Sequence, residues 1–520
     1  MHELDRRDFI RVAGLGITAL AVSPRIYAEE IALEELTIAQ MRGYTARSLT
    51  EAYLQRIAAI DTQLRSVIEV NPDALAIAEG LDRERAAGRV RGPMHGIPVL
   101  IKDNIDTADR MRTSAGSLAL AESIAARDAH VVRRLREAGA VLLGKTNLSE
   151  WANFRSTHST SGWSGRGGLT RNPYALDRNC CGSSSGTGSS IAASLAAVGV
   201  GTETDGSIVC PSSACGLVGL KPTVGLISRS GIIPISHTQD TAGPMTRTVT
   251  DAAILLGAMT GVDSLDAITA TSRGHVHADY TTFLDPNGLR GARIGVARQS
   301  FGEHDQVKKV MESAIDTLRG LGATIVDPAD MKTYNQYNDS EFEVLLYEFK
   351  AGINAYLAQL APNVQSRSLA DLIRFNEENR EREMPYFGQE IFLQASLKGS
   401  LATPAYRKAL AKNNRLSRAE GIDAVMKQHK LDVLIAPTGG PVWTTDLVNG
   451  DHYTGGYSSA SAVAGYPHIT VPAGHAFGLP LGLSFFAGAW SEPALLKYAF
   501  AFEQATKARK PPQLLATART

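Results

Sequence analysis

The sequence has no excess of charge of either sign. Among its 520 residues, 53 basic and 53 acidic side chains balance to a formal net charge of zero. Proteins that bind nucleic acid usually carry a basic patch or tail, and neither a basic nor an acidic tail is present here. The composition therefore argues against nucleic acid as a partner.

Cysteine is scarce, and the four cysteines fall at positions 180, 181, 210 and 215. A chain of this length buries most of its unfolded surface without covalent cross-links. No histidine lies among the cysteines, and their spacing is not the paired C-x-x-C of zinc modules, so no metal site is expected. An even count leaves pairing open in an oxidising compartment. Because the cysteines cluster rather than join distant segments, we expect buried, unpaired thiols.

The N-terminus lacks a hydrophobic run long enough to cross a membrane. The apolar stretch from Val12 to Val22 has 11 residues, whereas a membrane-spanning helix needs about 20. Arg6 and Arg7 precede it, and Ala28 ends a plausible cleavage site. This segment resembles a twin-arginine export signal, so we expect residues 1–28 to be a signal and the mature protein to be periplasmic. The alternative is an amphipathic first helix with a chance arginine pair.

The rest of the chain has no repeats, linkers or low-complexity tracts, which favours one domain over residues 29–520. Short apolar runs alternate with helical patterns, and this predicts an α/β sheet covered on both faces. The run at 97–101 ends at Lys102, which predicts a buried strand with an amine at its end. Other expected elements are helices at 48–60, 128–137, 189–198 and 491–507, strands at 141–143, 294–297, 324–326 and 433–436, and a mostly helical region at 341–428.

A glycine- and serine-rich loop at 182–188 admits several interpretations. A phosphate-binding loop would need a lysine after Gly188, where the sequence has Ser189. The loop matches G-x-S-x-G, which would make Ser184 the nucleophile of an α/β-hydrolase. In an α/β-hydrolase this motif directly follows a β-strand. Residues 171–181 are polar and interrupted by proline, so they do not predict such a strand. A purely structural turn is the remaining alternative.

A fourth interpretation of the 182–188 loop combines three residues from three separate motifs, and it explains the sequence better than the alternatives above. Lys102 ends Gly96-Ile97-Pro98-Val99-Leu100-Ile101-Lys102, Ser183 follows Gly182, and Ser207 lies 24 residues further on in Thr204-Asp205-Gly206-Ser207. Together with Gly219-Leu220-Lys221-Pro222, these motifs resemble the amidase signature family. Residues 145–154, 346–350 and 489–493 look particularly like its bacterial peptide amidase branch.

The resemblance implies a fold and a chemistry. The fold is a single α/β amidase domain with a large mixed central β-sheet covered by helices on both faces, a signature core at about 90–260 and a variable helical substrate region at about 335–430. Burial of Lys102 would keep its amine neutral, so that it acts as a base. Ser183 would relay the proton and Ser207 would attack the amide carbonyl to form an acyl-enzyme.

The resemblance also assigns the oxyanion hole to the backbone N–H groups of Thr204, Asp205, Gly206 and Ser207, and it implies a cis peptide bond before Ser183. Two positions depart from the broader family pattern. Asp205 stands where a small residue is common, and Val209 stands where arginine is common, which puts an arginine near the nucleophile in doubt.

The family resemblance implies hydrolysis of carboxamides, and its peptide amidase branch removes ammonia from C-terminally amidated peptides. No metal or organic cofactor is required. A broader amidase or esterase acting on amino-acid or aryl amides, a transamidase that passes ammonia to a partner subunit, and a non-catalytic binding protein are the alternatives. Candidate substrate-binding residues are Asn153, Phe154, Trp163, Tyr347 and Phe349.

Overall fold

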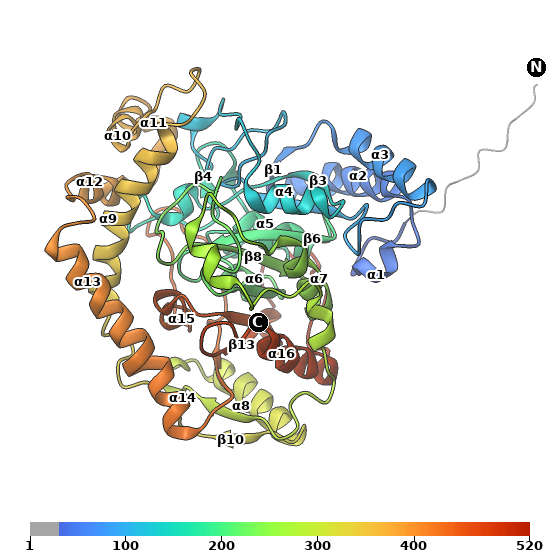
Figure 1. Ribbon diagram of the computed structural model, residues 1–520, viewed down its shortest axis with the longest axis vertical. Coiled ribbons are helices and arrows are strands. Elements are labelled where there is room, and N and C mark those ends of the chain that lie inside the picture. Colours follow the sequence, from blue (N-terminus) through green and yellow to red (C-terminus); the bar gives the residue numbers. More distant parts are fainter. Residues whose placement is uncertain (1–30, 520) are drawn as a thin grey trace, which may run out of the picture. The chain divides into compact units, whose positions relative to one another are not determined.

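A mixed β-sheet organises the molecule in the computed structural model, which describes residues 31–519. Eleven strands of the described chain lie in the order β1-β3-β2-β6-β8-β7-β12-β13-β11-β9-β10 (Figure 1). Strand β2 runs parallel to β3 and β6, and β9 runs parallel to β10 and β11, while the other neighbours are antiparallel. The strands are β1 (Val67–Val70), β2 (Pro98–Lys102), β3 (Val141–Thr146), β6 (Val198–Glu203), β7 (Val218–Lys221), β8 (Thr241–Thr246), β9 (Arg293–Val296), β10 (Thr324–Val326), β11 (Val433–Pro437), β12 (His468–Ala476) and β13 (Leu479–Phe486). A separate ribbon pairs β4 (Trp163–Ser164) with β5 (Gly168–Leu169).

Helices cover both faces of this sheet. Every residue of β2, β3, β6 and β13 is buried, and because successive side chains of a strand point to opposite faces, neither face is open to water. The central helices are α5, which packs against β2 and β6, and α6, which packs against β7, β12 and β13. The helices are α1 (Ile38–Met41), α2 (Ala46–Leu64), α3 (Ala74–Ala86), α4 (His130–Glu137), α5 (Ser185–Ala192), α6 (Val209–Ala214), α7 (Val249–Met259), α8 (Asp305–Gly320), α9 (Asn338–Leu357), α10 (Leu369–Glu378), α11 (Arg380–Glu383), α12 (Glu390–Ser396), α13 (Pro404–Asn414), α14 (Asp423–His429), α15 (Ser459–Ala464) and α16 (Glu492–Thr506).

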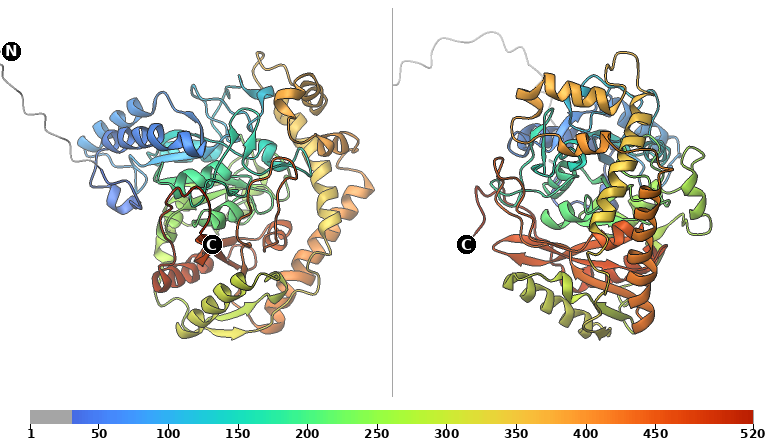
Figure 2. Two further views of the ribbon diagram at one scale, coloured as in Figure 1. Left: turned by 180° about the vertical axis from the view of Figure 1, so that it is seen from behind. Right: turned by 90° about the vertical axis from the view of Figure 1, so that its left-hand side faces the viewer.

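The region from α9 to α14 is helical, as the sequence predicts for 341–428. In Figures 1 and 2 these helices, coloured yellow to orange, run along one side of the sheet. Helix α9 packs against α12 and α13, and a hydrophobic cluster that includes Leu346, Phe349 and Phe392 joins it to Trp151 and Phe154 of the signature core. The helical region therefore shares a core with the part of the chain that carries the motifs.

Most of the predicted elements are confirmed, with shifts at their ends. Helix α2 begins at Ala46, two residues before the predicted start at 48, because Thr45 caps it by accepting the Ser48 N–H. Asp128 does not cap α4 and instead accepts from Ala108 N at 2.7 Å. The predicted helix at 189–198 is wrong in its position: α5 ends at Ala192 and Ser194 has a left-handed φ of 57°, so the chain turns before β6.

From Leu33 onward the chain forms one compact unit. Within the described residues, no helix combines the length and apolar character needed to cross a membrane. The predicted signal at 1–28 lies outside the described residues.

Candidate active site

Lys102 ends strand β2 inside the molecule, as its sequence position predicts. Parallel pairing of β2 with β6 sets Ile101 opposite Val200, so the next residues of both strands reach the same edge of the sheet. There Lys102 Nζ donates to Ser183 Oγ at 2.7 Å, to Thr202 Oγ1 at 2.9 Å and to Thr202 O at 3.3 Å. Asn104 Nδ2 also donates to Thr202 Oγ1, at 3.0 Å. Three acceptors therefore surround one amine.

Burial makes this amine a weak base for a lysine. The side chain is fully buried, and loss of hydration lowers its pKa to about 7, against the opposing attraction of the Asp240 and Glu203 carboxylates. A lysine with such a pKa is substantially neutral near neutral pH. In its unprotonated form, this amine has the free lone pair that a general base requires.

Ser183 and its neighbour Ser184 have different surroundings. The Gly182–Ser183 peptide bond is cis, as the family resemblance implies, and Ser183 O accepts from Ser149 N at 3.0 Å. The hydroxyl of Ser184 instead donates to Thr202 O at 3.1 Å and accepts from Thr202 N at 3.2 Å. Ser184 therefore ties the loop to β6, and this geometry disfavours the α/β-hydrolase alternative.

Ser207 lies on a turn between β6 and α6. Its carbonyl oxygen accepts from Ser184 N at 3.2 Å, which joins this turn to the Ser183 loop. Gly206 has a φ of 76°, a conformation that strongly favours glycine. Within the described part of the chain, the N–H groups of Thr204, Asp205, Gly206 and Ser207, the four expected donors, donate to no protein acceptor. Unpaired donors that converge on a turn are what an oxyanion hole needs.

Three carboxylates, one of them the fully buried Glu203, make hydrogen bonds that fix this turn. Glu203 Oε2 accepts from Ile208 N at 2.7 Å and from Val209 N at 3.0 Å, the two residues that follow Ser207. Thr204 Oγ1 donates to Asp240 at 2.6 Å, and Ser459 Oγ donates to Asp205 at 2.6 Å. The Asp205 side chain thus points to α15, which leaves its backbone N–H available.

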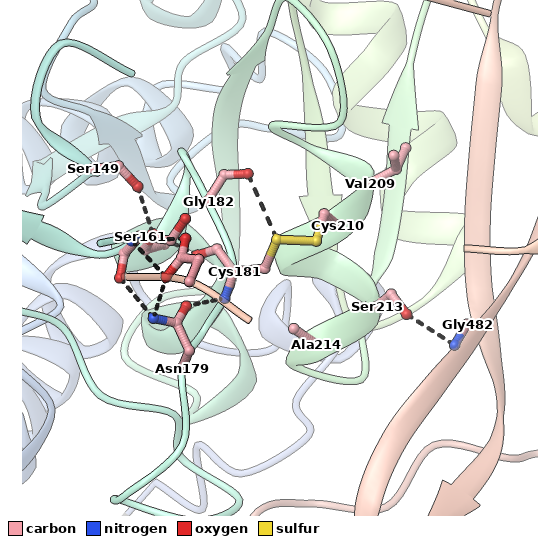
Figure 3. The surroundings of a disulfide bond; sticks show 12 residues. Ser149, Ser161, Asn179, Cys181, Gly182, Val209, Cys210, Ser213, Ala214 and Gly482 are labelled. Carbon is pink, nitrogen blue, oxygen red and sulfur yellow. Dashed lines mark hydrogen bonds between the residues drawn. A yellow bond between two sulfur atoms is a disulfide. The ribbon is translucent and has the colours of Figure 1, made fainter. Parts of the chain in front are cut away.

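A disulfide links the two serine-bearing segments, and this corrects the expectation of four unpaired thiols. Cys181 and Cys210 are bonded, with their Cα atoms 5.9 Å apart (Figure 3). The sequence shows only a cluster; the fold brings the chain before α5 against the first turn of α6 and so makes the pair. Cys180 and Cys215 remain free and buried, as expected.

A cavity of about 200 Å³ lies beside Thr202 and Asn104. Its polar lining includes Thr204 and Asp240, and its apolar lining is Ala152, Ile232, Ile233, Pro234, Ile235 and Leu265. None of the five predicted substrate-binding residues lines this cavity.

Four of those five residues have aromatic rings packed in the interior. Phe154 lies edge-on to Phe349 with ring centroids 5.1 Å apart, Trp163 lies edge-on to Phe387 at 5.2 Å, and Tyr347 lies 5.7 Å from Tyr406. Asn153 Nδ2 donates to Ser161 Oγ at 3.1 Å. The structure gives each side chain a protein partner, and their contact with substrate stays a prediction.

Comparison with known proteins identifies the family. The amidase family model matches residues 48–496. The chain belongs to the amidase family. A probable amidase of Arabidopsis thaliana is 43% identical over 507 residues, covering 96% of this chain and 94% of the relative.

Solved structures agree with this assignment. The peptide amidase PAM in complex with the competitive inhibitor chymostatin is 52% identical, with a TM-score of 0.90 over 93% of this chain and 100% of that one. The native peptide amidase from Stenotrophomonas maltophilia is 51% identical, with a TM-score of 0.89 over 93% and 99% of the two chains. The protein is therefore an amidase-type hydrolase with the amidase signature fold.

Sequence reasoning missed two residues of this amidase site. Thr202 supplies two of the three acceptors around Lys102, and Asp240 holds Thr204 from a loop far along the chain. The motif that contains Thr202 was visible, but its role depends on the register between β2 and β6, which no local pattern reveals. Glu203 orients the turn after Ser207 through its two hydrogen bonds to backbone N–H groups.

Proposed function

We propose that this amidase removes the terminal amide of C-terminally amidated peptides, giving a peptide acid and ammonia, with Lys102, Ser183 and Ser207 as its catalytic residues. The peptide substrate is supported by the likeness to peptide amidases that are 51% and 52% identical over nearly all of their length. The hydrogen bond of 2.7 Å between buried Lys102 and Ser183 carries the proposal for the triad.

The surroundings of Lys102 explain how a lysine can serve as base. A neutral amine has two N–H groups and one lone pair. Thr202 offers two acceptors, its carbonyl and its hydroxyl oxygen, and the hydroxyl oxygen already accepts from Asn104. If both N–H groups donate to Thr202, the lone pair faces the Ser183 hydroxyl. The arrangement therefore favours proton transfer from Ser183 to Lys102.

The reaction then follows from this arrangement. Lys102 accepts the proton of Ser183 as Ser183 accepts that of Ser207, and Ser207 Oγ bonds to the carbonyl carbon of the substrate. The oxyanion is stabilised by the unpaired N–H groups of the Asp205–Ser207 turn. Ser183 gives its proton to the nitrogen and takes one back from Lys102, the C–N bond breaks, and ammonia leaves. Water then repeats the relay on the acyl-Ser207 ester and releases the acid.

Hydrolysis across a substrate panel tests the substrate, measured as ammonia release for primary amides and as formation of the acid product for the other compounds. The panel contains peptide amides, the matching free peptides, amino-acid amides, aryl amides and esters. We expect the highest kcat/KM for peptide amides and no internal cleavage of free peptides. Higher kcat/KM for amino-acid or aryl amides would instead assign the broader amidase activity, and internal cleavage would contradict the proposal.

Covalent labelling tests the nucleophile separately. A fluorophosphonate probe should modify Ser207 alone, as mapped by mass spectrometry of the digested protein. Ser207→Ala should abolish labelling, whereas Ser184→Ala is the matched control in the same site and should still be labelled. Modification at Ser184, or none in an active preparation, would refute the triad.

We also propose that the protein is exported to the periplasm. The support is the arginine pair at Arg6 and Arg7 followed by a short apolar stretch, together with a disulfide of the kind that persists in oxidising compartments. Fractionation of cells that produce the full chain should place the enzyme in the periplasm, and Arg6→Lys with Arg7→Lys should retain it in the cytoplasm. Equal periplasmic yield from both would reject a twin-arginine route.

A further inference from the structure

The disulfide closes the segment of chain that carries both serines of the proposed triad. Cys181 is two residues before Ser183, and Cys210 is three residues after Ser207. The bonded pair closes a loop of chain in which both serines stand next to the closure point. A change in the geometry of this link would therefore reach both hydroxyl groups within three residues.

The backbone on each side of the link is itself fixed to a catalytic segment. Cys181 N donates to Asn179 Oδ1 at 2.7 Å, and Cys181 O accepts from Ser185 Oγ at 2.6 Å. Cys210 N donates to the carbonyl oxygen of Gly206 at 2.8 Å, inside the oxyanion turn. Figure 3 shows the Cys181 loop on one side of the sulfur bridge and helix α6 on the other. The bridge thus couples two locally rigid pieces.

The two pieces are also joined by noncovalent contacts. Ser184 N donates to Ser207 O at 3.2 Å, and α5 packs against α6. Lys102 Nζ donates to Ser183 Oγ, and the Ser184 hydroxyl makes two hydrogen bonds with Thr202 of β6. Within the described residues, no hydrogen bond joins the Ser183 and Ser207 hydroxyl groups, and the disulfide is the covalent link between the segments that carry them.

We propose that the Cys181–Cys210 disulfide is a positioning element for the serine relay, so that the oxidised enzyme is the fully active form. This inference rests on the triad of the proposed function. Cys210 is partly exposed and Cys181 is 6% exposed, so a small reductant can reach the bridge from the Cys210 side. Cys180 and Cys215 are free and fully buried nearby, and they serve as an internal comparison.

Reduction and reoxidation of the full-length enzyme test the proposal. A water-soluble phosphine gives two electrons to the disulfide and takes the oxygen of one water molecule, whose two protons end on the two thiols. Oxidised glutathione then restores the bridge and leaves as two molecules of reduced glutathione. We expect kcat for a cleavable amide to fall at least tenfold on reduction while KM changes less than twofold, and kcat to recover on reoxidation. Alkylation and peptide mapping must show Cys181 and Cys210 modified only after reduction.

Variants keep the test independent of the reductant. Cys181→Ala with Cys210→Ala should lower kcat as reduction does and should lose the response to the phosphine. Cys180→Ala with Cys215→Ala is the matched control and should keep that response. Circular dichroism at the assay temperature establishes that each protein is folded, and if the first pair does not fold, the reduced wild type supplies the measurement.

The outcomes separate this inference from the proposed function. Unchanged kcat in a folded, fully reduced enzyme would overturn the positioning role, as would free thiols at Cys181 and Cys210 in active enzyme. A proportional rise in KM with constant kcat would also overturn it, because the bridge would then act on substrate binding. Failure of peptide amides as substrates affects only the proposed substrate, since the same measurement runs with any amide that is cleaved. Fluorophosphonate labelling away from Ser207 would refute the triad itself.

Discussion

Lys102 and Ser183 are 81 positions apart in the chain, and a hydrogen bond of 2.7 Å joins Lys102 Nζ to Ser183 Oγ where both side chains are fully buried. This hydrogen bond depends on the end of strand β2, which carries Lys102, and on the loop before α5, which carries Ser183. Thr202 of β6 holds the amine in place through two further hydrogen bonds. Because each of these positions can be changed separately, the relationship gives direct tests.

Replacing Lys102 by methionine should remove the base and leave the fold intact. General base catalysis contributes about 100- to 10,000-fold to rate, so we expect kcat/KM to fall by that range. The folded-state pKa of Lys102 is about 7 and its ordinary value is 10.5. Burying the amine therefore costs stability below pH 10.5, most of all below pH 7. Lys102→Met should accordingly melt at pH 7 no lower than the wild type by differential scanning calorimetry. A folded variant with unchanged rate would refute the role of Lys102.

The pH dependence of the wild type should report the same group. The base works only when it is unprotonated, so kcat/KM should rise with pH through a midpoint near the Lys102 pKa of about 7 and level off above it. Below the midpoint the rate should fall about tenfold per pH unit. Initial rates between pH 5 and 9 measure this curve. A flat profile, or a rate that falls as pH rises from 6 to 8, would contradict a neutral lysine base.

Glu203→Gln should weaken the turn that follows Ser207. The carboxylate accepts two backbone N–H groups through one oxygen, and charge-assisted hydrogen bonds are roughly twice as strong as neutral ones. We expect kcat to fall about tenfold, equivalent to about 1.4 kcal/mol, with KM within twofold of the wild type. Glu51→Gln, at an exposed carboxylate on α2, is the control for loss of one negative charge. An unchanged kcat would show that the turn holds without the charge.

Arg155 should prove essential to stability rather than to catalysis. Its guanidinium is fully buried, is paired with Glu150, donates to Glu383 O at 2.6 Å and stacks 4.4 Å over the Phe387 ring. Arg155→Met leaves the Glu150 carboxylate buried without its partner, which typically costs about 3–5 kcal/mol.

The matched control for Arg155 removes both charges. Arg155→Met with Glu150→Gln should recover part of the lost free energy of unfolding, because the uncompensated charge is gone while the amide oxygen can still accept from Gly165 N. Urea denaturation measures both variants. A double variant no more stable than the single one would show that packing, not charge, sets the loss.

Sequence and structure agree where the signal is local. Burial of an apolar run that ends in lysine could be predicted because the strand 97–101 has no polar face to turn to water, and β2 is buried throughout. The Ser183 and Ser207 motifs could be placed because their glycines mark tight loops, and Gly206 has the positive φ that such a turn needs.

Agreement ends where a residue depends on a distant partner. Cys181 and Cys210 come together only because α5 and α6 pack against each other, and the role of Thr202 follows from strand register. The aromatic residues near the helical region were proposed to contact substrate. The sequence does not distinguish an aromatic residue that packs in the core from one that lines a binding pocket. Phe154 and Phe349 belong to one hydrophobic cluster, so their burial could not be separated from binding by composition alone.

Two carboxylates of the helical region have a practical consequence for protein engineering. Glu383, the last residue of α11, accepts from Leu118 N at 2.6 Å, and Glu390, the first residue of α12, accepts from Thr157 N at 2.6 Å, so this region is bonded to two segments of the signature core. In a chimera that takes residues 338–396 from another amidase, the hydrogen-bond acceptors of the imported helices would match the loops of that other amidase and not the loops of this one. Grafts intended to change substrate range should therefore carry the segments around 117–118 and 150–157 together with the helices, as one interdependent unit.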